Sequence, residues 1–278
     1  MDTPPPPKPQ KNFGECSIDK IARSLGETFD LTPRQKAVIE CFKGPHVQDF
    51  FTVIPIEGLG QCMSAVEYKA ILKYRLMIPM YPEDETRPIC RKACMDKYGE
   101  HAVHCKELPG FKCRHDWVRD VSGDILRRAV ISAKKEAPVN FLTDHMEGRS
   151  TLRPVDLLVF VWAGGKHACV DLIGVSPLAG LRENRFVAGQ AIRKAESKKV
   201  DKHAKACADN HHAFVPFAFD TFGSLAPEVI CLFTRVQQVV HSSGSSTGGQ
   251  WFVFNRLEFA IQKGVAAQLV ARLPTILM

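Results

Sequence analysis

Two apolar segments joined by a Gly-Gly turn constrain this chain more than any other feature. The run RPVDLLVFVWAGGKHACVDLIGVSP, at 153–177, predicts two strands that meet at Gly164 and Gly165. Asp156 opens the first strand, and Asp171 lies inside the second. A carboxylate in such apolar surroundings is costly to bury unless it is paired. Two aspartates on adjacent strands can face each other and hold a hard divalent cation through oxygen ligands.

The segments on either side of this strand pair predict an α/β fold. From residue 117 to residue 220 the expected order is helix, strand, strand, strand, helix, strand, which suits an α/β sandwich around a mixed sheet. The expected elements outside the strand pair are helices at 117–133 and 188–208, strands at 136–142 and 213–220, and closing helices at 225–241 and 251–272.

Composition divides the chain into six stretches. A proline-rich polar tail predicts disorder, and a Ser/Gly-rich stretch predicts a flexible linker. Thr32 before Pro33, and the capping box of Ser64 with Glu67, predict two helix starts. In chain order the stretches are the tail (1–12), a helical module (13–80), a Cys/His-rich linker resembling a zinc knuckle (81–113), the α/β core (114–241), the flexible linker (242–249) and a C-terminal helix (250–278).

The cysteines and the lack of targeting signals predict an intracellular protein. Ten cysteines occur, the first residues form no apolar signal-peptide core, and no window is apolar enough to cross a membrane. We therefore expect thiols or metal ligands rather than disulfides, and no membrane partner. The net charge of +7 is compatible with a polyanionic partner. Because Walker, dinucleotide and nucleophile-elbow motifs are missing, we expect no small-molecule cofactor.

Lysines downstream of the aspartate pair supply further groups for phosphodiester chemistry. The helix expected at 188–208 carries two basic stripes. Their members are Lys194, Lys198, Lys202 and Lys205 on one stripe, and Lys199 with His203 on the other. In metal-assisted cleavage, carboxylates bind Mg²⁺, the metal activates water, and a lysine orients the nucleophile or steadies the phosphate. A plainer interpretation also fits the spacing: a half-buried aspartate at a strand end and a solvated basic helix face.

A cluster of cysteines and histidines upstream suits a structural zinc ion. Cys90, Cys94, His101 and Cys105 would close a tetrahedral site. Several unrelated thiols in one loop are the alternative. Just before the helix at 117–133 stands the triplet Arg114, His115 and Asp116. We expect Asp116 to cap that helix and the two basic residues to lie near its positive end, where a phosphate would be favoured. A cap with two surface basic residues is the plainer alternative.

Taken in this order, the motifs resemble the C-terminal part of non-LTR retrotransposon polyproteins, plant copies in particular. These elements carry a restriction-endonuclease-like domain of the PD-(D/E)XK class behind their reverse transcriptase. The resemblance covers roughly 45–278. The segments that carry it are GEHAVHC (99–105), LPGFKCRHD (108–116), LRPVD (152–156) and AIQKGVAAQLVARL (260–273).

The resemblance implies a CCHC zinc element followed by a Mg²⁺-dependent endonuclease with an αβββαβ core, which nicks DNA. Asp156 and Asp171 would bind the Mg²⁺, Lys199 or Lys202 would be the catalytic lysine, and Glu136 an accessory acid. The nucleic-acid contacts would come from Arg114, His115, Lys194, Lys198 and Lys205. DNA is the expected partner, with RNA as a second polyanion, and the expected location of a functional protein is the nucleus.

Several residues depart from the family pattern. Arg87 stands where the zinc set would begin, and Val155 separates the proline from Asp156. Ile173 occupies the usual lysine position, and His203 stands where many relatives have a tyrosine. No reverse-transcriptase motif is present, so we expect a detached 3′ fragment of such an element. A catalytically dead nucleic-acid-binding relic is therefore the main alternative, and a degenerate fragment without selected function is a third.

Overall fold

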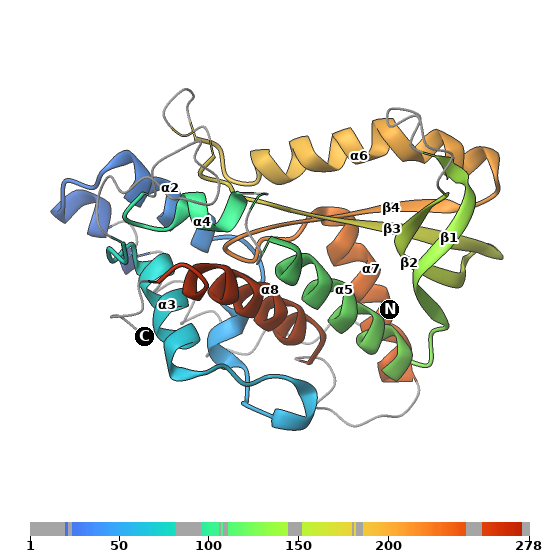
Figure 1. Ribbon diagram of the computed structural model, residues 1–278, viewed down its shortest axis with the longest axis horizontal. Coiled ribbons are helices and arrows are strands. Elements are labelled where there is room, and N and C mark those ends of the chain that lie inside the picture. The colour runs from blue at the N-terminus through green and yellow to red at the C-terminus, as the bar shows by residue number, and fades with distance from the viewer. Residues whose placement is uncertain are drawn as a thin grey trace, which may run out of the picture.

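The two predicted strands lie side by side in the middle of a sheet in the computed structural model of the protein (Figure 1). The structure describes residues 20–21, 24–81, 96–105, 107, 111–143, 152–179, 181, 186–242 and 252–273. Within these residues a mixed α/β architecture surrounds one four-stranded sheet. The strands are β1 (Ala133–Thr143), β2 (Leu152–Ala163), β3 (Lys166–Val175) and β4 (Ala213–Asp220), in that spatial order. β1, β2 and β3 pair antiparallel, whereas β3 and β4 pair parallel.

The turn between β2 and β3 uses the two glycines singled out in the sequence. Gly164 and Gly165 have φ angles of 56° and 77°, the left-handed values that a two-residue type I′ hairpin requires. Ala163 pairs with Lys166 at the turn, but farther along Val159 pairs with Ala168. Residues 160–162 of β2 therefore lie opposite a single residue of β3. This bulge shifts the register by two residues and keeps the same side chains on the same face.

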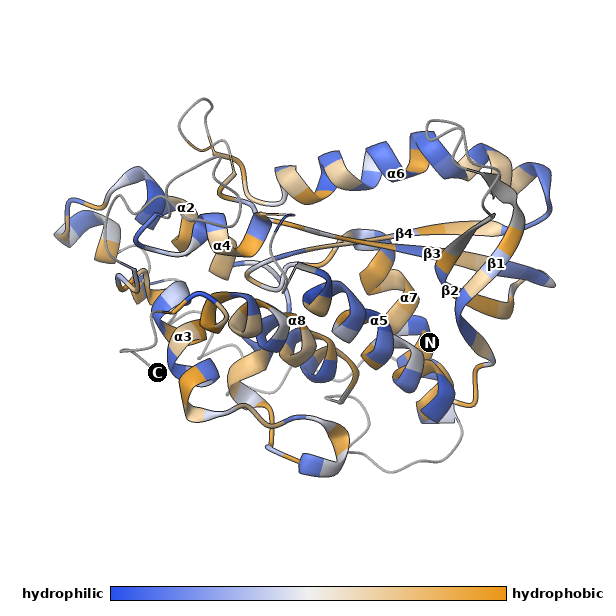
Figure 2. Ribbon diagram, viewed as in Figure 1, coloured by the Kyte–Doolittle hydropathy of each residue, from blue (hydrophilic) through white to orange (hydrophobic). Residues whose placement is uncertain are grey.

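Four helices lie on the two sides of the described sheet. They are α5 (Phe111–Arg128), α6 (Gln190–Asp209), α7 (Pro227–Ser242) and α8 (Phe252–Val270), and α8 packs against α5 rather than directly on the strands. α6 runs along one face, and the other three lie on the opposite side (Figure 1). Hydrophilic and hydrophobic residues alternate along α6 (Figure 2), as expected for a helix with one face on a sheet.

Alternate residues of β3 point to these two layers. Ala168, Val170 and Leu172 join the main apolar core with residues of α5, α7 and α8. Cys169 points the other way and packs with Cys207 of α6 in a smaller cluster. Asp171 shares the face of Cys169, so the sheet directs this aspartate toward α6.

Helices that precede the sheet form a second apolar core, and α8 connects it to the first. Their bounds are α2 (Pro33–Phe42), the 3₁₀ turns Asp49–Thr52 and Glu57–Leu59, α3 (Ala65–Leu76) and α4 (Glu100–His104). The predicted helix starts are confirmed, because Thr32 and Ser64 both form capping boxes. α8 contacts both α3 and α5, and Arg75 forms a buried ion pair with Glu258 at 3.4 Å.

Several expected boundaries differ from the structure. α5 begins at Phe111, so Asp116 lies inside the helix, and the prediction that it caps the helix was wrong. The strand expected at 136–142 extends from Ala133 to Thr143. The tail at 1–12 and residues 243–249 of the linker expected at 242–249 lie outside the described residues, whereas Ser242 is the last residue of α7. In the described part of the chain, no helix is both long and apolar enough to span a bilayer.

Candidate functional site

The carboxyl groups of Asp156 and Asp171 meet between adjacent strands. Leu157 pairs with Val170, and one step farther along this register Asp156 lies opposite Asp171. The two side chains are hydrogen-bonded to each other, and the main-chain N–H of Leu172 donates to Oδ2 of Asp156 at 2.6 Å. Both side chains are largely buried, with 18% and 19% of their surface exposed. The sheet thus brings together the two predicted metal ligands.

The two aspartates differ in their affinity for a proton. Burial raises the pKa of Asp171, and the negative charge of Asp156 raises it further, while Lys199 acts in the opposite direction. Burial also opposes ionisation of Asp156, but the hydrogen bond and charge of His115 hold the pKa of Asp156 below its usual value. The site therefore contains Asp156, which ionises readily, and Asp171, which retains its proton more tightly. A divalent cation held by both side chains would offset the repulsion between two carboxylates, so the donor set fits Mg²⁺.

α6 supplies a cation to this pair. Nζ of Lys199 lies 2.7 Å from Oδ2 of Asp171, and Nε2 of His203 lies 3.6 Å from the same oxygen. The two residues are one helical turn apart and share a face, as the second stripe in the sequence predicts. The other lysine considered, Lys202, is exposed and is not among the residues that line the site. Geometry therefore favours Lys199 as the lysine of the site.

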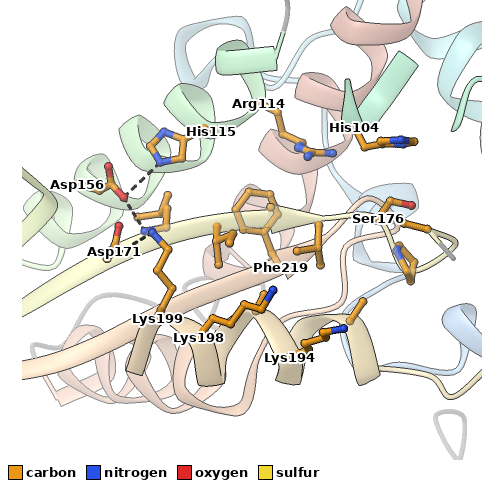
Figure 3. Close-up of a pocket in the computed structure, with 18 of the residues that line it drawn as sticks. His104, Arg114, His115, Asp156, Asp171, Ser176, Lys194, Lys198, Lys199 and Phe219 are labelled. Atoms are coloured by element: carbon orange, nitrogen blue, oxygen red, sulfur yellow. Dashed lines mark hydrogen bonds and ion pairs between the residues drawn. The ribbon is translucent and has the colours of Figure 1, made fainter. Parts of the chain in front are cut away.

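His115 of α5 contacts the pair from the other side (Figure 3). Its Nε2 lies 3.3 Å from Oδ2 of Asp156, and its Nδ1 lies 3.4 Å from Oδ1 of Asp116. Burial disfavours the imidazolium, but the bonds to Asp156 and Asp116 raise the pKa of His115 above its usual value. The sequence indicated a nucleic-acid contact for His115. The structure places it against a predicted metal ligand, a position that was missed because α5 was expected to begin later.

A cleft of about 1100 Å³ extends from the carboxylate pair between α5 and α6. Arg114, Lys194 and Lys198 line its other end, and Figure 3 shows them on opposite walls. Arg114 is only 3% exposed, and its Nη1 has no hydrogen-bond partner among the described residues. A buried N–H group without an acceptor is costly. An anion entering the cleft would supply the missing acceptor.

Two glycines make room for Arg114. A Cβ on Gly174 of β3 would lie 3.1 Å from Nε of Arg114, and a Cβ on Gly264 of α8 would lie 2.6 Å from its Cα. The guanidinium also lies 5.9 Å from the ring of Phe219. The cleft end that holds this cation is therefore shaped by β3, β4 and α8 together.

Two other predicted site residues are engaged elsewhere. Glu136 lines the cleft, but it is exposed and forms an ion pair with Arg119. Lys205 pairs with Asp209 at 2.8 Å and is not among the residues that line the cleft. Neither residue is brought into contact with the aspartate pair.

The zinc prediction falls only partly on described residues. Cys90 and Cys94 lie outside them. The main-chain N–H of His101 donates to Asp96 at 2.8 Å, and Cys105 is buried at the end of α4. Within the described residues, no group of three or more His, Cys, Asp or Glu side chains is arranged to hold a metal. Among the described residues we therefore consider the aspartate pair as a metal site, because Mg²⁺ usually binds one or two carboxylates with waters and substrate phosphates.

Comparison of the chain with protein-family models, with curated proteins and with solved structures finds no match. The geometry of the cleft and the sequence motifs are therefore the basis for the functional conclusion.

Proposed function

We propose that the protein is a Mg²⁺-dependent DNA endonuclease with a restriction-endonuclease-like core, derived from a non-LTR retrotransposon. The observation that carries the proposal is the meeting of Asp156, Asp171 and Lys199 at one end of a cation-lined cleft. Two acidic groups and a lysine at one point are the parts that metal-assisted phosphodiester hydrolysis requires. The order α5, β1, β2, β3, α6, β4 also agrees with the αβββαβ core that the resemblance implies.

Each group in the cleft has a role in this proposal. Asp156 and Asp171 would hold Mg²⁺, which supplies charge neutralisation and a more acidic water. Lys199 is placed to orient that water or to steady a phosphate oxygen. His115 fixes the orientation of Asp156 through its hydrogen bond. Arg114, Lys194 and Lys198 would hold the backbone of the strand, because phosphate contacts position nucleic acid without reading its sequence. Such an enzyme would act in the nucleus.

A nicking assay tests this proposal. Supercoiled plasmid would be incubated with the wild-type protein and Mg²⁺, and relaxation would be compared for Asp156→Asn, Asp171→Asn and Asp209→Asn. Asp209 is an exposed partner of Lys205 on the same helix as Lys199, and it serves as the matched control. We expect nicking that disappears in the first two variants and persists in the third. Equal nicking by all four proteins would contradict the assignment.

A second candidate is a DNA-binding relic of the same element that has lost catalysis. Two departures favour it: Ile173 occupies the usual lysine position, and Val155 separates Pro154 from Asp156. This candidate predicts salt-dependent DNA binding with no cleavage in Mg²⁺ or Mn²⁺. Binding with nicking that Asp171→Asn abolishes would rule it out, and binding without nicking would favour it over the enzyme.

A further inference from the structure

Two cysteines face each other across the interface between α6 and the sheet. Cys169 of β3 and Cys207 of α6 are fully buried, and both are free thiols. Both side chains pack in one small apolar cluster between β3 and α6. Ala137, Val139 and Leu158 belong to the same apolar cluster. The pair therefore connects two elements that are far apart in the sequence.

This thiol pair belongs to the same interface as the groups around Asp171. Cys169 precedes Asp171 by two residues and points to the same face of β3. On α6, Cys207 continues the stripe of Lys199 and His203 at intervals of four residues. Any covalent link at the thiols would therefore fix the helix that presents Lys199 and His203 to Asp171.

We propose that Cys169 and Cys207 form a reversible disulfide that fastens α6 to β3. The oxidant is a small-molecule disulfide such as oxidised glutathione. One cysteine sulfur attacks this reagent as a thiolate, breaks its S–S bond and releases one thiol. The other cysteine sulfur then displaces the second thiol, so two cysteine thiols become one disulfide and the reagent becomes two thiols. The two side chains already pack in one cluster across this interface, and a disulfide requires such close neighbours.

Access of the oxidant depends on α6. Among the described helices, α6 runs along this face of the sheet (Figure 1), and Cys169 packs with Cys207 of α6. Opening of its C-terminal turns exposes both thiols without disturbing the core formed by α5, α7 and α8. Closing the helix then brings the sulfurs back together. The alternative is that the two cysteines serve only as small apolar side chains.

The experiment compares reduced and oxidised forms of the full chain. Cys113 and Cys231 are exposed, so both would first be changed to Ser to limit links between molecules. The protein would be incubated with oxidised glutathione, alkylated and digested, and its peptides identified by mass spectrometry. We expect a peptide pair joined through Cys169 and Cys207, which dithiothreitol separates. The melting temperature of the oxidised form should rise by about 5 °C.

Cys207→Ala in the same background is the control, since it keeps the site apolar and removes one sulfur. It should show neither the joined peptides nor the rise in melting temperature. Alkylation of both thiols after oxidation, or a link from either one to another cysteine, would overturn the proposal. A link that leaves the melting temperature unchanged would also overturn it, because α6 would not be fastened. These measurements do not depend on nicking activity, so the disulfide proposal and the endonuclease proposal can be contradicted independently.

Discussion

Nζ of Lys199 lies 2.7 Å from Oδ2 of Asp171, and the two groups come from a helix and a strand on opposite sides of one interface. Asp171 in turn is hydrogen-bonded to Asp156. Lys199 therefore balances the charge of a carboxylate pair that burial would otherwise force to retain a proton. In the proposed enzyme, a bound Mg²⁺ would take over that balance, and the amine of Lys199 would then turn toward a phosphate.

Replacing Lys199 tests this arrangement. Lys199→Met keeps an unbranched side chain of similar length and removes its charge, so we expect nicking to fall about 100-fold or more. DNA affinity should change by less than about threefold, since other cations line the cleft. Plasmid nicking and a filter-binding titration measure the two effects. Lys202→Met is the matched control, because Lys202 is exposed on the same helix and is not among the residues lining the cleft. Equal losses in the two variants would contradict a specific role for Lys199.

The meeting of Asp156 and Asp171 was predicted from the sequence, but its exact pairing could not be. If the strand pairing continued regularly from the two-residue turn at Gly164 and Gly165, Asp156 would lie opposite Ile173. The bulge at 160–162 shifts the register, so that Asp156 faces Asp171 instead. Alternation along a strand fixes the face of each side chain. Val161 has a φ of 48° in the bulge, but valine is not a residue typical of turns, so its identity does not indicate the bulge.

Other parts of the site depended on tertiary packing. The start of α5 at Phe111 was missed because its first turn contains Cys and basic residues rather than an apolar stripe. That early start places Arg114 in a space left by Gly174 and Gly264, from two distant elements. The spacing of apolar residues along one element predicts neither the contact of Arg114 with Gly174 nor its contact with Gly264. The order of helices and strands, by contrast, follows from periodicity and agrees with the structure from α5 to α8.

We expect the buried charge of Arg114 to increase the affinity for DNA without stabilising the fold. Arg114→Gln removes a buried charge that lacks a partner on Nη1, so we expect the free energy of unfolding to stay equal or rise. DNA affinity should fall about tenfold, and the slope of log affinity against log salt should decrease by about 1. Urea unfolding and binding titrations at several salt concentrations measure these effects. Lys205→Gln, a surface control paired with Asp209, should leave both nearly unchanged. A large loss of stability in Arg114→Gln would instead indicate a structural role.

The close packing at Gly264 gives a prediction about the fold. In Gly264→Ala the new Cβ would lie 2.6 Å from Cα of Arg114, so backbone must shift. We expect the free energy of unfolding to fall by about 1–3 kcal/mol and DNA affinity to fall with it. Gly58→Ala is the control, since a Cβ there meets nothing within 4 Å, and it should change stability by less than about 1 kcal/mol. Chemical denaturation of the two variants makes the comparison, and equal stability would contradict the packing argument.

Asp220 at the end of β4 makes stability depend on pH. Burial raises the pKa of Asp220 to about 6, while main-chain N–H groups, including those of Phe222 and Ser224, act in the opposite direction. A carboxyl group whose pKa is higher in the folded state favours folding below its unfolded pKa of 3.8, and this contribution is lost as the pH rises through about 6.

Asp220→Asn isolates this effect. The amide oxygen can still accept the bonds that Oδ1 now receives from Phe222 at 2.9 Å and Ser224 at 3.0 Å, but the group no longer ionises. Relative to wild type, the variant should gain stability as the pH rises from about 4 to about 6.5, by up to roughly 3 kcal/mol. Urea unfolding of both proteins across this range measures the difference. The pKa values of Glu258 and Glu100 are also raised. Because both residues are present in the wild type and in the variant, their effect on the pH dependence of stability largely cancels in the difference. A stability difference that stays constant from pH 4 to pH 6.5 would show that Asp220 does not titrate with this pKa.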